Sequence, residues 1–331
     1  MLKKIMVIIV IFAVVAVVYP YKKLAQTGFQ FLSVSQVSRA SGMGEAFITI
    51  CDGADAVFYN PAGMVLMRSR LFEVSVNNLQ WIADIKYSSI GMVFSPFERR
   101  YGVFGMSIMW VDYGVFYGTM VYPSLDGYVE TGTFSPRATS IGVAYSKNLT
   151  DRFMVGGQIK YVALNIGRTV IPDAISETGL TAKDFVASVT AFDFGTVFKT
   201  GIKSLVFGMN VRNFSKEIKF YREGFQLPLT FTMGVSFDLL DLVDSEKRGN
   251  NSLLVAVDAV HPRAYPEYVN LGMELKLFGT FSIRAGYKSN QDEYGTAYGF
   301  GLEKFGLKFD YSYTPFKNFD GVQRLTLKFS I

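Results

Sequence analysis

The sequence predicts an all-β fold, a 14-stranded antiparallel transmembrane β-barrel with a short N-terminal helical plug. Half of the residues are hydrophobic and 15% are aromatic, yet after residue 20 no apolar run is long enough to cross a bilayer as a helix. From residue 70 onward, apolar and polar residues alternate in segments of about ten residues, a length that crosses a membrane as a tilted strand. The number of these segments is even, as in bacterial barrels.

The chain begins with a segment typical of export. Lys3 and Lys4 precede the apolar run 5–18, which is short for a spanning helix and suited to a signal peptide. Ala25 is the best small residue for cleavage, but Lys23 lies two positions before it, so the sequence does not fix the cleavage site. An uncleaved N-terminal anchor is the alternative. We divide the chain into a signal peptide (1–25), an N-terminal plug segment (26–68) and a transmembrane barrel (69–331).

The plug segment contains a sequence that looks like a phosphate-binding loop. "GMGEAF" starts with Gly42 and Gly44, but Phe47 stands where the third glycine of a dinucleotide loop belongs, and no β-α-β unit follows. The nucleotide-binding interpretation therefore fails. Helical spacing and a turn at Asn60–Pro61 instead predict a short helical segment that leads into the first strand.

Period-two alternation defines the strands. In "QRLTLKFSI" the polar residues share one face and the apolar residues share the other. We predict fourteen strands, starting near residues 70, 84, 101, 136, 153, 187, 204, 228, 251, 267, 280, 295, 307 and 322.

The connections between these strands alternate in length. Among the odd connections, 114–135, 167–186 and 214–227 are long; among the even ones, 149–152, 200–204 and 305–306 are short, with 240–250 as an exception. Long loops on one side and tight turns on the other are typical of outer-membrane barrels. This parity predicts a bacterial outer-membrane protein with both termini in the periplasm. A soluble β-sandwich is the alternative, but it would carry more Lys and Pro at sheet edges.

Small and charged residues gather on the polar faces of the strands. Seven glycines there suggest that the N-terminal segment packs closely against the inner wall: Gly142, Gly208, Gly234, Gly272, Gly286, Gly299 and Gly301. A charge facing lipid near the midplane costs about 2–4 kcal/mol, so the charged residues are expected in the lumen. The candidate lumen-facing residues are Asp258, Glu274, Arg284, Gly299, Gly301, Asp310 and Arg324.

Composition excludes several chemistries. A single cysteine, Cys51, and a single histidine, His261, leave no intrachain disulfide, no His/Cys zinc site and no Cys-His nucleophile pair. Two lumenal acids could form a hydrolytic dyad, but acids interleaved with bases favour a structural ion-pair lattice. We predict no catalytic residue, metal or cofactor. The net charge of +5 is scattered, which argues against nucleic-acid binding.

The run "SRASGMGEAFITICDGADAVFYNPAGM" resembles the N-terminal signature of the PorV/PorQ family, within the FadL/TodX-like group of fourteen-stranded outer-membrane barrels. The last strands resemble that family too, and the middle of the chain matches in pattern alone. The matching N-terminal residues are Arg39, Gly42, Gly44, Ala46, Asp52, Ala54, Ala56, Asn60, Pro61, Ala62 and Gly63. The matching C-terminal residues are Arg284, Ala285, Gly286, Tyr287, Asp310 and Tyr311.

The resemblance implies transport or secretion across the outer membrane, by a PorV-like accessory protein of type IX secretion. The alternatives are a FadL-like passive channel for hydrophobic small molecules and a purely structural barrel. The implied partners are outer-membrane lipid and either a hydrophobic small molecule or secretion-system proteins. For the secretion alternative, the connection "MVYPSLDGYVETGTFSP" offers Tyr122, Tyr128 and Phe134 as a docking surface.

Overall fold

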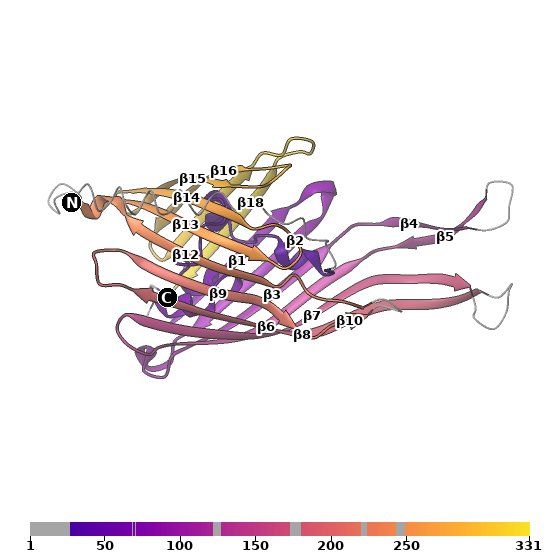
Figure 1. Cartoon of the computed structure of the whole chain (residues 1–331), viewed down its shortest axis with the longest axis horizontal. Coiled ribbons are helices and arrows are strands. Elements are labelled where there is room, and N and C mark those ends of the chain that lie inside the picture. Colours follow the sequence, from indigo (N-terminus) through magenta and orange to yellow (C-terminus); the bar gives the residue numbers. More distant parts are fainter. Residues whose placement is uncertain are drawn as a thin grey trace.

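Fourteen antiparallel strands close into a barrel in the computed structural model (Figure 1). The structure describes residues 27–67, 69, 71–121, 127–172, 180–219, 224–242 and 249–331. The barrel strands are β1 (Phe72–Gln80), β2 (Lys86–Phe94), β3 (Val103–Asp112), β6 (Arg137–Asn148), β7 (Phe153–Pro172), β8 (Leu180–Lys199), β9 (Val206–Ser215), β12 (Thr230–Asp238), β13 (Ser252–Pro262), β14 (Tyr268–Leu277), β15 (Phe281–Lys288), β16 (Thr296–Lys304), β17 (Leu307–Thr314) and β18 (Val322–Ser330).

The predicted strand number and order are confirmed, because each strand pairs with its sequence neighbour and β18 pairs with β1. Thirteen strands begin within two residues of the predicted positions. The exception is β8, which was expected near residue 187 and begins at Leu180. The predicted loop 167–186 is wrong for the same reason, since Gly167 to Pro172 pair with Phe185 to Leu180.

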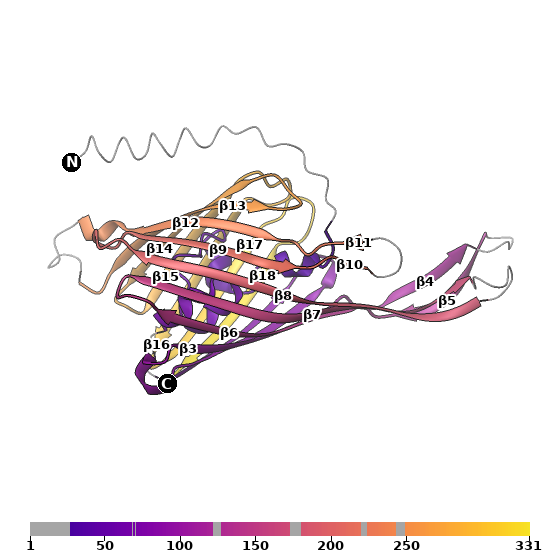
Figure 2. The same ribbon diagram turned by 60° about the horizontal axis from the view of Figure 1, so that its bottom comes forward.

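Two ribbons project beyond the barrel (Figures 1 and 2). One is the continuation of β7 and β8. The other is a hairpin of β4 (Phe116–Val121) and β5 (Tyr128–Phe134), in a connection that was predicted as a loop. A shorter pair, β10 (Ile218–Lys219) with β11 (Gly224–Phe225), lies in the β9–β12 connection. Tyr122, which was proposed for docking, lies outside the described residues.

The outward positions of the barrel strands form an apolar belt. Met106 on β3 and Val143 on β6 are paired and exposed, and Phe300 on β16 and Leu327 on β18 are exposed as well. Such a belt is unfavourable in water and is typical of a barrel wall that faces hydrocarbon. Among the described residues, no helix is long and apolar enough to span a membrane.

The N-terminal residues 27–67, here called the plug, lie inside the barrel (Figure 2). The plug comprises η1 (Gln30–Ser33), α2 (Ser38–Gly42), η2 (Gly53–Phe58) and η3 (Pro61–Leu66). Helix α2 contacts β15 to β18, whereas η3 contacts β6 to β8 on another part of the wall. Three short helices lie in connections: η4 (Ile82–Asp84), η5 (Pro96–Arg99) and η6 (Leu239–Leu242).

The plug crosses the lumen from end to end. Thr27 bridges to Gln226 in the β9–β12 connection, at the end that carries the long connections. Ile331 lies at the other end, which carries the short turns such as 149–152 and 305–306. The start of β1 and the end of β18 thus lie at the same end of the barrel, the short-turn end, as predicted. The first described residue, Thr27, lies at the opposite end. Residues 1–26, including the expected signal peptide, lie outside the described residues.

Candidate functional site

Close backbone approaches fix the plug against the wall. A Cβ atom at Gly286 would lie 1.9 Å from the backbone nitrogen of Gly44, and one at Gly272 would lie 2.5 Å from the carbonyl oxygen of Met43. The Cα atom of Gly42 would lie 3.2 Å from a Cβ at Gly299. Only glycine allows backbones to approach this closely. The glycine pattern in the last strands therefore has a steric cause.

Two glycines of the predicted set leave space for side chains of the barrel wall instead of space for the plug. A Cβ at Gly301 would meet the side chains of Asp310 and Arg284, and one at Gly142 would meet Gln158. These positions leave room for large polar side chains inside the lumen. Gly208 lies against Thr49 of the plug, and Gly234 lies against both Asp258 of the wall and Ile48 of the plug.

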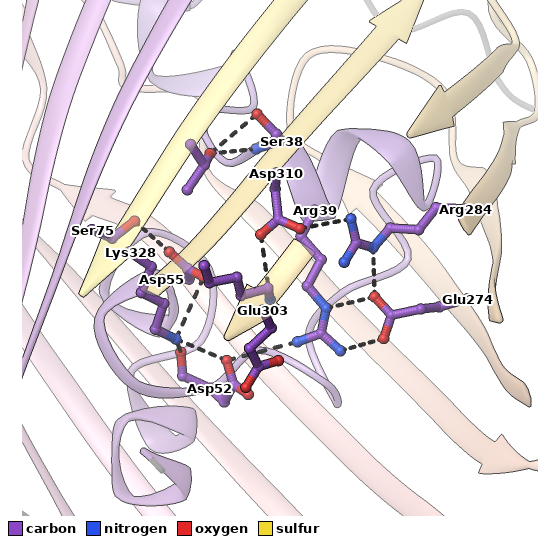
Figure 3. Close-up of polar contacts among 12 residues, drawn as sticks. Ser38, Arg39, Asp52, Asp55, Ser75, Glu274, Arg284, Glu303, Asp310 and Lys328 are labelled. Carbon is purple, nitrogen blue, oxygen red and sulfur yellow. Dashed lines mark hydrogen bonds and ion pairs between the residues drawn. The ribbon is translucent and has the colours of Figure 1, made fainter. Parts of the chain in front are cut away.

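A chain of buried ion pairs joins α2 to three strands (Figure 3). The guanidinium of Arg39 donates to both carboxylate oxygens of Glu274, at 2.9 Å from Nε and 2.8 Å from Nη2. Arg284 also donates to Glu274 and lies 2.8 Å from Asp310. Lys308 extends the chain, with its Nζ 3.3 Å from Asp310.

A second set of ion pairs, at the short-turn end, centres on Lys328. Its Nζ lies 3.0 Å from Asp52, 3.6 Å from Asp55 and 3.2 Å from Glu73. The hydroxyl of Ser75 donates to Asp55 at 2.6 Å. Asp52 also approaches Arg39 at 3.7 Å, so the two sets form one network.

The network is suited to holding the plug in the lumen. Every acid in it faces a lysine or arginine, as in the expected lattice, and removing one partner of a buried pair leaves a costly unpaired charge. Among the described residues, no group of three or more His, Cys, Asp or Glu side chains could hold a metal ion.

The remaining candidate residues also contact the plug. Asp258 accepts hydrogen bonds from the backbone nitrogens of Phe47 and Ile48, at 2.7 and 3.1 Å. Arg324 donates to the carbonyl oxygen of Ser35 at 3.1 Å, and its guanidinium lies over the ring of Trp81. Neither contact was foreseen from the sequence, because each joins residues more than two hundred positions apart.

The Asn60–Pro61 turn has a structural role. The Asn60 amide nitrogen donates to the carbonyl oxygens of Ile48 at 3.0 Å and Thr196 at 3.1 Å, which ties the plug to β8. Its side-chain oxygen accepts from the backbone of Ala62 and caps η3, with Pro61 at the first position of the helix. A Cβ at Gly63 would collide with Cys51. The motif residues Asn60 to Gly63 thus build one compact turn.

The long-connection end of the lumen is apolar, which sequence reasoning missed. Here Phe29, Phe31 and Leu32 of the plug pack against inward-facing wall residues. This group, the mouth cluster, is defined by the buried side chains of Phe29, Phe31, Leu32, Leu79, Tyr87, Met109, Val111, Ala138, Val162, Ala187, Val189, Ala191, Ile218, Leu227 and Val322. The signal was present as Val111, Val162 and Val189, which are inward-facing apolar residues near the long-connection ends of their strands.

The lumen becomes polar directly below the mouth cluster, and at the short-turn end a second apolar group, with Val103, Met154 and Val197 of the wall, packs against the plug. A cavity of about 40 Å³ marks the change. Leu32 and Met109 line one part of it, and Gln158, Lys160 and Asp193 line another. This space is large enough for a water molecule but too small for a hydrocarbon. A mixed-charge cavity of about 260 Å³ lies at the short-turn end, lined by Asp52, Glu73, Glu303, Lys308, Lys328 and their neighbours.

Cys51 offers an internal reporter of plug position. Its side chain is buried, and burial raises the pKa of its thiol. A buried, protonated thiol is a poor nucleophile. We therefore expect Cys51 to resist a maleimide in the folded protein and to react fully once the protein is denatured, as measured by mass spectrometry. Rapid labelling of the folded protein would show that the plug leaves the lumen.

Three solved structures share this architecture. No protein-family model matches the chain, and no curated protein sequence matches it significantly. The toluene transporter TbuX of Ralstonia pickettii matches with a TM-score of 0.56 and 15% identity, over 90% of this chain and 98% of that chain. The CymD monoaromatic hydrocarbon channel matches at 0.58 with 11% identity, and a Pseudomonas aeruginosa FadL homologue at 0.54 with 12%; each match covers 90% of this chain and 98% of the other.

At these identities the comparisons establish the fold. Their names describe a toluene transporter, a monoaromatic hydrocarbon channel and a FadL homologue. The PorV/PorQ resemblance and the link to type IX secretion are not among these findings. The chain is therefore similar in fold to FadL/TodX-type outer-membrane barrels.

Proposed function

We propose that this chain is a bacterial outer-membrane barrel that admits a hydrophobic small molecule through the mouth cluster. The observation that carries the proposal is the change of polarity directly below the mouth cluster. Tyr87, Val111 and Val162 make the mouth apolar, whereas the next inward positions are polar and include the ion pair of Lys160 with Asp193. Farther down, the inward side chains of Val103 and Met154 pack against the plug itself. The similar structures are named as toluene and monoaromatic hydrocarbon carriers, which supports an uncharged aromatic or aliphatic substrate.

In this proposal the N-terminal part of the plug occupies the substrate site. Phe29, Phe31 and Leu32 fill the mouth with the same chemistry that a hydrocarbon offers. A substrate would have to displace them, because the adjacent cavity is too small. The ion pairs of Arg39 would keep the rest of the plug in place during this exchange.

Two substitutions in the mouth cluster should act in opposite directions. Phe31→Ala removes an occupant and should raise the rate of radiolabelled toluene uptake by cells that make the barrel. Val162→Asp should lower uptake by at least about tenfold, because an unpaired carboxylate in an apolar site costs several kcal/mol. Val121→Asp is the matched control, because Val121 is 90% exposed on a projecting ribbon. Unchanged uptake in both mouth variants would contradict the proposal.

A protein-binding role of PorV type is the second candidate. It is favoured by the projecting β4–β5 hairpin, which exposes Tyr117, Val121 and Tyr128. An isolated two-stranded ribbon is marginally stable in water, so a partner would stabilise it. The same control variant distinguishes the two candidates: in the secretion alternative, Val121→Asp would reduce a co-purifying polypeptide, with no effect on toluene uptake.

A further inference from the structure

Three neighbouring short turns form one continuous surface at the short-turn end. These are 95–102, 147–152 and 199–205, here called the basic rim. The Tyr145 hydroxyl donates to the carbonyl oxygen of Tyr101 at 2.7 Å and joins the first turn to β6. The backbone nitrogen of Lys199 donates to the carbonyl oxygen of Arg152 at 2.8 Å and joins the second turn to the third.

The basic rim is strongly charged, and the opposite end of the same strands has the opposite sign. The rim contains six basic and two acidic residues, a net charge of +4. The connections 81–85, 113–136, 173–179 and 216–229, at the other end, contain seven acidic and three basic residues, a net charge of −4. The two ends of this part of the barrel therefore suit different surroundings.

Carboxylates do not neutralise the rim charges within the described part of the chain. Arg100, Lys147 and Lys199 are exposed, and none of them forms an ion pair with a carboxylate whose side chain the structure describes. Arg152 and Lys203 donate only to the backbone carbonyl oxygens of Thr200 and Asp241. Carbonyl oxygens do not cancel a positive charge, so the rim can still attract anions.

Apolar side chains stand among these charges. Phe97 is 76% exposed, Ile202 is 66% exposed and Leu149 is 58% exposed, all in rim turns. Phe97 also has a φ of +50°, a left-handed conformation that is strained for a bulky residue. Exposure of this apolar ring to water does not offset the strain of the turn. Burial in an interfacial layer of lipid would give the ring a favourable environment.

The rim continues into the apolar belt. Phe104 packs against Tyr145 with ring centroids 5.2 Å apart, directly above the first turn. Phe153 and Phe198 pair at 6.3 Å above the other two turns. A molecule with an anionic head at the rim could therefore lay its apolar tail along the barrel wall.

We propose that the basic rim binds the phosphodiester head groups of anionic phospholipids. The acyl chains would follow the belt above it, and the short-turn end would face a phospholipid leaflet. The proposal rests on the membrane location proposed above but not on substrate transport. The occupant is lipid, because the rim combines positive charge, exposed apolar side chains and continuity with the lipid-facing surface.

The test is lipid selectivity at the barrel surface. The full-length protein is placed in phosphatidylcholine bilayers with spin-labelled phosphatidylglycerol or spin-labelled phosphatidylcholine, and the immobilised fraction of each lipid is measured. We expect phosphatidylglycerol to be preferred by on the order of fivefold. Arg100→Gln/Lys147→Gln/Lys199→Gln should bring the preference close to unity. Lys86→Gln/Arg137→Gln/Lys317→Gln removes the same charge at the other end and should keep it.

Each alternative outcome would overturn the proposal. A wild-type preference near unity, or equal loss in both triple variants, would mean that the rim is not a lipid site. Competition by inorganic phosphate beyond that of sodium chloride at equal ionic strength would indicate a site for free phosphate. Loss of the preference only on adding a periplasmic extract would indicate a protein partner. Protection of Cys51 from maleimide confirms that each variant is folded, and Val162→Asp, which tests transport, should leave lipid selectivity unchanged.

Discussion

Glu274→Gln is expected to cost about 3–5 kcal/mol of stability, the usual effect of removing one partner from a buried ion pair. Glu274 receives hydrogen bonds from both Arg39 and Arg284, so its loss leaves Arg284 with Asp310 alone and leaves the buried guanidinium of Arg39 with only Asp52, 3.7 Å away. The measurement is thermal denaturation in detergent, followed by the loss of the compact band on a gel without boiling.

The matched control is Glu303→Gln. Glu303 pairs with Lys276 at 2.7 Å, but both side chains are partly exposed. We expect a loss of about 1 kcal/mol or less, because solvent screens such a pair. The double variant Arg39→Gln/Glu274→Gln should be more stable than Glu274→Gln alone, because it also removes the buried guanidinium that has lost its partner. Equal stability of Glu274→Gln and the control would show that the network does not hold the plug.

Gly286→Val is expected to prevent the plug from docking while the barrel still closes. The new side chain would overlap the backbone of Gly44 and Met43, which has no flexible atoms that could move aside. Cys51 should then react with maleimide, and planar bilayers with this variant should show increased ion conductance because the lumen is open.

Gly157→Val serves as the control for Gly286→Val. Gly157 faces outward, and a Cβ there would lie 3.6 Å or more from its neighbours, which is ordinary contact. This variant should keep Cys51 protected and the conductance low. A protected Cys51 in Gly286→Val would mean that the plug adapts to the side chain, and the proposed steric role of this glycine would be wrong.

The barrel was predictable because each strand is defined by a pattern within about ten consecutive residues. Period-two alternation and the spacing of turns gave the fourteen strands, and β8 was misplaced only where its ladder continues beyond the belt. Outside the belt both faces meet water, so alternation is not needed. The β4–β5 hairpin was missed for the same reason.

The site was only partly predictable, because its contacts are long-range. The glycines of the inner face indicated close packing by the plug, and the charges indicated a lattice. The pairing of Arg39 with Glu274, 235 positions apart, could not be read from either residue alone. The mouth cluster was missed because a few apolar residues on a polar face carry little weight until Phe29 and Phe31 are placed against them.

The most direct test of the central claim is photocrosslinking with a small hydrocarbon that carries a diazirine, applied to cells that make this barrel. Labelled residues are identified by peptide mass spectrometry. We expect labels at Phe29, Phe31 or Met109 in the mouth cluster, in addition to background on the lipid-facing belt, and we expect toluene to compete with the mouth labels. Labels confined to belt residues such as Val143 and Phe300 would contradict entry of a hydrophobic molecule through the mouth cluster.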